Sequence, residues 1–106
     1  MQIFEVNTVL ATASTFKKSY FEFLRISSMS IGIYRLLAGS QDMQKPHKQD
    51  EVYFVQKGRG NIEVDGITHP VSPGSIIYVP ALADHRFKEI AEDLELLVFF
   101  APAEDG

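Results

Sequence analysis

The sequence contains no cysteine. It can therefore form no disulfide bond, and it offers no thiolate as a nucleophile or metal ligand. It also contains no Walker-type loop, no GxGxxG and no GxSxG pattern, so phosphate-cradle and serine-hydrolase functions lack their residues. No apolar run approaches the roughly 18 to 20 residues of a membrane span, and we expect no membrane partner.

Basic residues are few. Lysine and arginine total 10 against 14 aspartate and glutamate residues, which gives a formal net charge of -4. This balance argues against nucleic acid as a main partner, because a phosphate backbone requires a basic surface. The sequence begins with no basic region followed by an apolar block, so we expect no signal peptide and a cytoplasmic protein. A length of 106 residues is that of one domain, predicted over residues 1–106.

Short apolar runs alternate with glycine and proline turns after residue 19, a pattern typical of a β-sandwich or barrel. We therefore predict an all-β fold with only a short helical turn, near residues 7–11. The predicted strands are 2–6, 20–27, 29–38, 51–56, 61–64, 67–71, 75–79, 85–90 and 94–100, with turns at 58–60, 65–66 and 92–93.

The stretch from residue 45 to residue 58 organises the chain. Side chains alternate between the two faces of a strand, so extended structure here would place residues of one parity together. Those residues are Lys45, His47, Glu51, Tyr53 and Val55. An imidazole and a carboxylate on one interior face cannot be left unpaired without a large cost in free energy. They need each other, a water network, a cation or a metal.

Gly39, His47, Glu51 and Gly58 follow a recognisable spacing, with three residues between the histidine and the glutamate and six more before the glycine. This spacing resembles the first motif of the cupin superfamily, in which two histidines one residue apart precede the glutamate. In this register Lys45 stands where that motif has its first histidine. In an alternative register His47 is the first histidine, but Glu51 then follows too closely.

Gly74, Pro80 and His85 match the second cupin motif, with Leu82 at the position where a glycine is usual. The Asp65-Gly66 hairpin separates the two motifs, as it does in that superfamily. The resemblance covers roughly residues 30 to 100. It implies a double-stranded β-helix, that is, a small jelly-roll barrel.

Cupins often bind a divalent metal through three histidines and the glutamate. Carried over residue by residue, the resemblance leaves His47, Glu51 and His85 as metal ligands. Two imidazoles and one carboxylate suffice for a catalytic first-row metal, and Fe, Mn, Ni, Zn or Co would all suit them. The alternative is a metal-free site, in which the ammonium of Lys45 pairs with Glu51.

Further residues are candidates for a small-ligand pocket. Tyr53 and Phe87 each follow a predicted ligand on the same face, where they either fill the core or form pocket walls. Tyr34 and Arg35 point to opposite faces, so one of them would face the interior, and an inward arginine could clamp a carboxylate. Lys45 completes the predicted pocket, whereas His69 is expected in an exposed hairpin.

Three functions remain open at this point. The first is a small metal-dependent enzyme, of dioxygenase, isomerase or lyase type, that acts on a small oxygenated or acidic molecule. The second is a non-catalytic barrel that binds or senses a small ligand, and the third is a metal-free barrel whose role is assembly. We also expect a homodimer through residues 20–26 and 29–37, because these strands carry more apolar surface than one small interior can hold.

Overall fold

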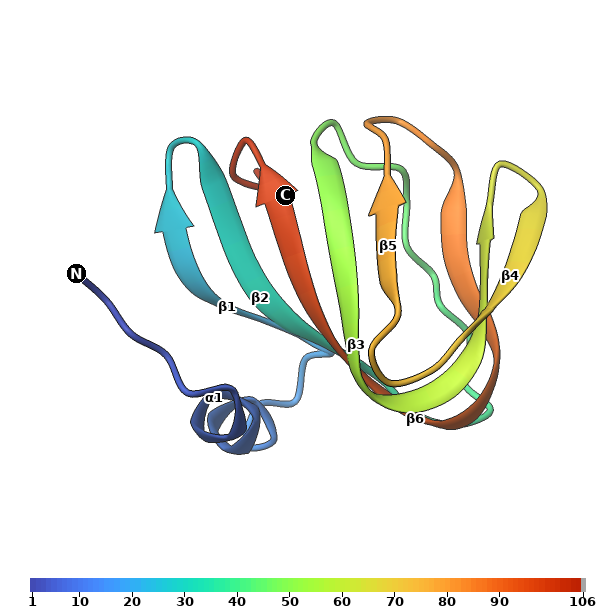
Figure 1. The fold of residues 1–106 in the computed structure, drawn as a ribbon, viewed down its shortest axis with the longest axis horizontal. Coiled ribbons are helices and arrows are strands. Elements are labelled where there is room, and N and C mark those ends of the chain that lie inside the picture. Colours follow the sequence, from blue (N-terminus) through green and yellow to red (C-terminus); the bar gives the residue numbers. More distant parts are fainter. Residues whose placement is uncertain (106) are drawn as a thin grey trace.

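The computed structural model describes residues 1–105. The chain forms one short helix followed by strands that are all antiparallel to their neighbours (Figure 1). The strands form one sheet in the order β1-β2-β6-β3-β4, and β5 pairs with β3. The elements are α1 (Val6–Ala13), β1 (Tyr20–Ile26), β2 (Met29–Leu36), β3 (Asp50–Val64), β4 (Ile67–Val71), β5 (Ile76–Val79) and β6 (His85–Ala101).

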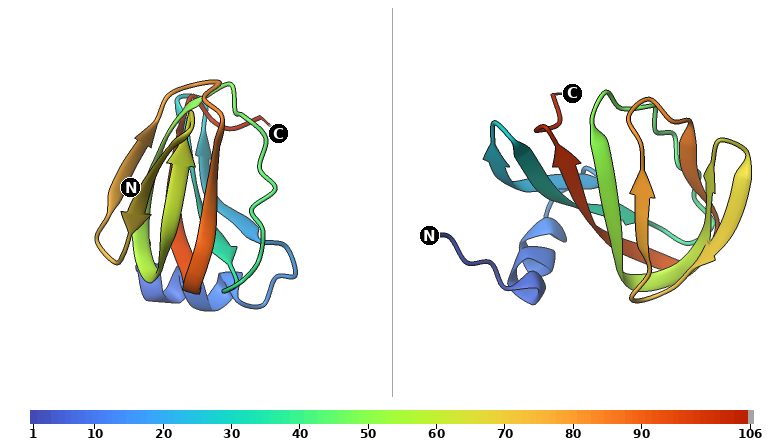
Figure 2. Two further views of the ribbon diagram at one scale, coloured as in Figure 1. Left: turned by 90° about the vertical axis from the view of Figure 1, so that its right-hand side faces the viewer. Right: turned by 45° about the horizontal axis from the view of Figure 1, so that its top comes forward.

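The two long strands, β3 and β6, give the sheet its curvature. The first part of β3 pairs with β5 and its last part with β4, while β6 runs beside both parts. The register between β3 and β6 shifts repeatedly between Val55 and Asn61, and such bulges bend a strand and increase its twist. The sheet folds over without closing, and the strandless segment 37–49 runs along the side away from β4 and β5 (Figure 2). The prediction of an all-β jelly roll with a short helix is confirmed.

The predicted turns at 58–60 and 92–93 are wrong, because β3 and β6 continue through them. Gly58 has a φ of 95°, and a Cβ added there would lie 2.2 Å from the backbone oxygen of Asp93. The glycine thus allows the two backbones to approach closely at the bend. Glycine in a strand is often the mark of such a close approach and not of a strand end.

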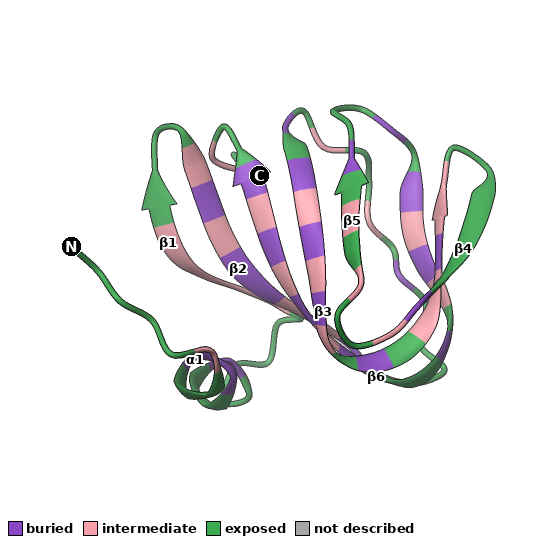
Figure 3. Ribbon diagram, in the orientation of Figure 1, coloured by how far each residue is buried: buried purple, intermediate pink, exposed green. Residues whose placement is uncertain are grey.

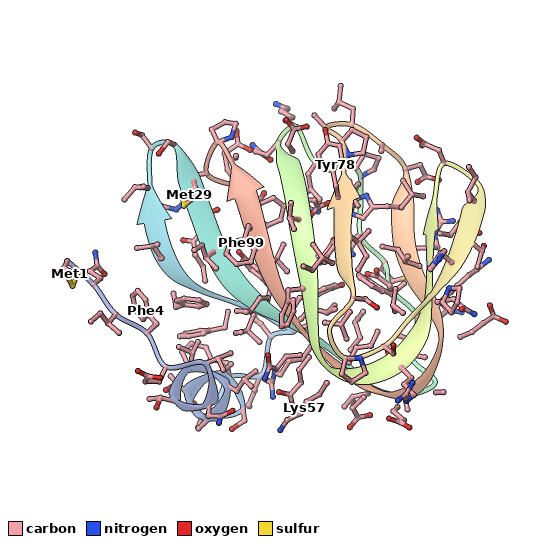
Figure 4. The ribbon with its side chains drawn as sticks, in the orientation of Figure 1. Met1, Phe4, Met29, Lys57, Tyr78 and Phe99 are labelled. Atoms are coloured by element: carbon pink, nitrogen blue, oxygen red, sulfur yellow. The ribbon has the colours of Figure 1, made fainter. Side chains whose placement is uncertain are left out.

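The main core lies inside the curved sheet. Buried residues alternate with half-buried or exposed ones along β3 and β6, as the coloured bands show (Figure 3). Phe99 and Tyr78, labelled in Figure 4, alternate with core residues and lie on the outer face. The core is formed chiefly by Leu36, Tyr53, Val55, Ile62, Val79, Phe87, Leu94, Leu96, Val98 and Phe100.

The N-terminal helix covers part of the outer face of the sheet. Its residues Val9, Leu10 and Ala13 form a second apolar cluster with Ile33 of β2. The predicted strand over 2–6 is wrong, since residues 2–5 are not in a strand and the helix begins at Val6. The chain therefore covers some of the apolar surface that suggested a dimer, and the homodimer stays a prediction. None of the helices in residues 1–105 has the length and apolarity to cross a membrane.

Replacing Gly58 by alanine should destabilise the fold more than the same change at Gly74. Both glycines have a φ of 95°, but a Cβ at Gly74 meets nothing within 4 Å. Gly74→Ala should lower the free energy of unfolding by about 1–2 kcal/mol through the left-handed backbone alone. Gly58→Ala should lose about 1–3 kcal/mol more, because the backbones must move apart. Urea unfolding of both variants measures the difference, and equal losses would contradict the close approach.

Candidate metal centre

His47, Glu51 and His85 come from three different places in the fold. Glu51 is near the start of β3, His85 begins β6, and His47 lies in the strandless segment before β3. Glu51 pairs with Val79 at the end of β5, and the turn that follows β5 leads directly to His85. The same turn holds the third residue, because the N–H of Leu82 donates to the carbonyl of His47 at 2.7 Å.

Leu82 is the residue at which the sequence departs from the second cupin motif. It occupies the position where a glycine is usual, and it has a φ of 68°. The left-handed conformation is thus kept without a glycine, at a cost of roughly 1–2 kcal/mol. The backbone needs this conformation to turn from β5 towards His85.

The three side chains form one compact group. Their potential ligand atoms all lie within 4.8 Å of one another. His85 Nε2 and Glu51 Oε1 are 2.8 Å apart, and both side chains are only 1% exposed. The ring of His47 is half-buried, and its centroid lies 5.4 Å from that of His85. The structure therefore brings together all three residues that the sequence proposed as ligands.

The contact between His85 and Glu51 becomes a hydrogen bond only when His85 carries a proton on Nε2, despite its short distance. His85 Nδ1 lies 2.9 Å from the carbonyl oxygen of Ala83 and donates its proton there. In neutral histidine this leaves Nε2 with a lone pair that faces a carboxylate, which also offers only lone pairs. Both His85 Nε2 and Glu51 Oε2 are buried without a hydrogen-bond partner. A cation or an added proton between them would remove this conflict, so the donor set fits a divalent metal.

The pKa of His85 reflects the same contact. Burial opposes its protonation, but the adjacent Glu51 carboxylate and the Ala83 carbonyl outweigh burial and raise the pKa above its usual value. A proton and a metal ion therefore compete for Nε2. Metal binding at this group should release that proton.

A cavity of about 270 Å³ opens beside His47. It is smaller than the ~300–1,000 Å³ typical of drug-sized ligands, so it has room only for a small molecule. Most of its exposed lining is apolar. Its lining residues come from β1, β2, β3, β6 and the two loops that flank them, and are Tyr20, Tyr34, Gln44, His47, Tyr53, Val98, Phe100 and Glu104.

Three tyrosine hydroxyls converge on this cavity. Tyr34 donates to Asp42 Oδ1 at 2.6 Å and Tyr53 donates to Gln44 Oε1 at 3.0 Å, whereas the hydroxyl of Tyr20 has no hydrogen-bond partner. Burial is the main cause that raises the pKa of each of them above the usual value. All three phenols therefore stay protonated at neutral pH, and of the three only the Tyr20 hydroxyl has a proton that is not already donated within the protein.

The other residues predicted for the pocket are divided between cavity, core and surface. Tyr34 and Tyr53 line the cavity, and Phe87 lies beneath it, with its ring edge-to-face against Tyr53 at 4.9 Å. Lys45 is exposed, and none of the ion pairs recorded within residues 1–105 involves it. Lys45 therefore does not pair with Glu51, whose partner is His85. Arg35 points to the other face and donates to the carbonyl of Phe16.

Four cavity or second-layer residues were missed by the sequence analysis. Asp42 and Gln44 lie in the strandless segment 37–49, Tyr20 begins β1, and Glu104 belongs to the polar C-terminal tail. None of them stands in a motif. His69 is exposed, as expected.

The family model of the cupin domain matches residues 32–100. The chain belongs to the cupin superfamily. Members of this superfamily commonly bind a metal, and the described residues include the His47, Glu51 and His85 group that could hold one.

Two relatives and a solved structure are similar to this cupin. A Streptomyces coelicolor protein named as uncharacterised is 47% identical over 104 residues, which cover 98% of this chain and 99% of that protein. The dimethylsulfoniopropionate lyase DddW of Ruegeria pomeroyi is 31% identical over 75 residues, or 71% of this chain and 49% of the lyase. This cupin thus spans about half of the lyase's length. The structure of TT1209 from Thermus thermophilus is 27% identical, with a TM-score of 0.75, over 97% of this chain and 99% of that one.

Glu51→Gln should lower the pKa of His85 in the metal-free protein. The pKa is raised in the folded state, so the paired charge stabilises the fold fully below the unfolded value of about 6.5. That stability is lost as the pH rises through the folded pKa. We expect NMR titration of the histidine ring to show the lower pKa in Glu51→Gln, and urea unfolding to show a weaker pH dependence.

Glu92→Gln is the control for this prediction, because it removes an exposed carboxylate from the same strand as His85. It should leave the His85 titration unchanged. An identical His85 pKa in wild type and Glu51→Gln would show that the buried contact carries no charge interaction.

Proposed function

We propose that this cupin is a metal-dependent lyase, in which His47, Glu51 and His85 hold a divalent ion at the floor of the tyrosine-lined cavity. Its substrate would be a small carboxylate with a leaving group on the β-carbon, such as dimethylsulfoniopropionate. The observation that carries the proposal is the buried pair of His85 Nε2 and Glu51, which are 2.8 Å apart and need a proton or a cation between them.

The donor set supports a catalytic and not a structural ion. Structural zinc sites are closed by four protein ligands, whereas three ligands leave positions for water or substrate. Two imidazoles and a carboxylate suit Fe, Mn, Ni, Zn or Co. When bound, such an ion supplies Lewis-acid polarisation of a carboxylate or carbonyl oxygen. His85 is prepared as a ligand, because the carbonyl of Ala83 fixes its Nδ1 proton and turns Nε2 towards Glu51.

The cavity supports a small ligand with oxygen atoms. The Tyr20 hydroxyl is buried and unpaired, so a ligand oxygen would satisfy it. Val98 and Phe100 provide apolar walls that exclude water. A carboxylate ligand would thus find a hydrogen-bond donor in Tyr20 and apolar surface in Val98 and Phe100.

Tyr53 is the residue best placed to accept the α-proton that elimination removes from the substrate, which requires its phenol to lose its own proton first. It is fully buried, and its hydroxyl faces both Gln44 and the Glu51 carboxylate. Burial and then the charge of Glu51 raise its pKa, so that the phenol keeps its proton in the free protein. A nearby divalent cation would offset the Glu51 charge and make that proton easier to exchange.

The similarity to a dimethylsulfoniopropionate lyase favours elimination over the other reactions open to cupins. It covers 71% of this chain, at 31% identity. The fold alone would not decide this, because one fold serves many reactions.

Metal analysis of the untagged protein tests the site. We expect close to one equivalent of a first-row metal in the wild type, and its loss in His47→Ala and in His85→Ala. His69→Ala is the matched control, since it removes an exposed histidine away from the cavity, and it should keep the metal. Absence of metal from the wild type, even after incubation with Fe, Mn, Ni, Zn and Co, would contradict the proposal.

Turnover tests the reaction. The metal-loaded protein should release dimethyl sulfide from dimethylsulfoniopropionate, or eliminate a related β-leaving group, as followed by gas chromatography. Tyr53→Phe should keep the metal but lower kcat by about 10²–10⁴-fold, the usual contribution of a proton-transfer group. Ligand binding without turnover across the panel would instead support the non-catalytic binding or sensing barrel.

A further inference from the structure

We infer that Gln44 supplies a fourth ligand to this metal centre, through its side-chain oxygen, in place of the missing first histidine. The inference rests on the proposed metal centre and adds a residue to it. It concerns residues 40–44, which belong to neither of the motifs found in the sequence.

The position of the Gln44 oxygen carries the argument. Gln44 Oε1 lies 3.2 Å from His47 Nε2 and 3.0 Å from the hydroxyl of Tyr53. Two ligand atoms, each about 2.1 Å from one ion, are about 3.0 Å apart in octahedral geometry and about 3.4 Å apart in tetrahedral geometry. The separation of Gln44 Oε1 from His47 Nε2 falls within that range. The 2.8 Å contact between His85 and Glu51 is close to its lower limit.

The orientation of the Gln44 amide is set by its other end. Gln44 Nε2 donates to Asp42 Oδ2 at 2.7 Å, so the amide oxygen must point the opposite way, towards His47 and Tyr53. An amide that faced the site with its NH₂ group would repel a cation, because that group has no lone pair to offer. The acceptor end is therefore the one presented to the metal position.

Asp42 anchors this arrangement from within the protein. It is only 6% exposed, and its carboxylate accepts hydrogen bonds from the Tyr34 hydroxyl at 2.6 Å and from the Phe87 N–H at 2.8 Å. A buried carboxylate is costly unless such donors satisfy it. These bonds connect the loop to β2 and β6, so Gln44 is held by two strands of the sheet. Asp42 is a positioning residue, because its oxygens accept these bonds and orient the Gln44 amide.

Lys45 does not take this role, although cupin spacing assigns the first histidine to its position. Its side chain is exposed and lies outside the tyrosine-lined cavity, whereas that of Gln44 lines it. Gln44, the residue before Lys45, thus offers a neutral oxygen ligand at this site. With two nitrogen and two oxygen ligands the site carries a single negative charge from Glu51, a set suited to Mn²⁺ or Fe²⁺. An octahedral ion would keep two positions for water or substrate.

Mn²⁺ binding measures this assignment without any need for turnover. The affinity is obtained by electron paramagnetic resonance titration, and the number of exchangeable waters on the ion by water proton relaxation. Gln44→Ala should weaken Mn²⁺ binding by at least the roughly 10–100-fold that loss of a supporting residue causes at metal sites. It should also add one exchangeable water, which fills the vacated position.

Two further variants complete the experiment. Gln44→Glu keeps an oxygen donor, so it should bind Mn²⁺ at least as tightly as the wild type and with the same water number. Lys45→Ala is the matched control from the adjacent position, and both of its values should equal those of the wild type. Thermal unfolding of each metal-free variant shows whether it is folded.

The possible failures are distinguishable. Unchanged affinity and water number in Gln44→Ala would overturn the role of Gln44 while leaving the three-ligand centre in place. Weaker binding with an unchanged water number would show that Gln44 acts only through His47, which also overturns it as a ligand. A wild type that binds neither Mn²⁺ nor any other first-row ion would overturn the metal centre as a whole.

Discussion

The site depends on one unresolved electrostatic contact, between His85 Nε2 and the carboxylate of Glu51. The two groups are 2.8 Å apart and almost fully buried, and with neutral His85 no hydrogen bond joins them. A buried carboxylate that meets a buried lone pair is unfavourable, so the fold must hold these residues in place by other interactions. It does so through the pairing of β3 with β5 and through the turn that leads from β5 to His85. The same geometry that raises the pKa of His85 in the metal-free protein creates a position for a cation.

The apolar core and the cavity on the two sides of this contact have different roles. The apolar core beneath it, with Phe87 against Tyr53, fixes the strands that carry the ligands. The cavity above it is lined mainly by apolar atoms and protonated tyrosines, which suits a small ligand that bears oxygen atoms. Asp42 connects the two layers, because it accepts hydrogen bonds both from a strand backbone and from residues that line the cavity. Its burial is explained by this connecting role.

The sequence predicted the elements that depend on local patterns and spacing. The antiparallel strands, the Asp65-Gly66 hairpin and the grouping of His47, Glu51 and His85 follow from alternation, turn residues and motif spacing. The predicted inward orientation of Lys45 is wrong. β3 begins only at Asp50, and the alternation of side chains in a strand does not extend through the loop that precedes it. The turn predicted at Gly58 is wrong, because β3 contains this glycine at a bulge and continues beyond it. The role of Gln44 could not be predicted from the sequence, because side chains in a loop follow no regular alternation. The orientation of Gln44 depends on its hydrogen bond to Asp42.

The most direct test of the metal centre is a crystal structure of the metal-loaded protein, with anomalous diffraction recorded at the absorption edge of the ion. The account predicts one anomalous peak, within about 2.0–2.3 Å of the side-chain donors of His47, Glu51 and His85. The contradicting result is protein crystallised with excess metal that shows no peak there. His85 and Glu51 would then remain in direct contact, and the proton alone would balance their charges.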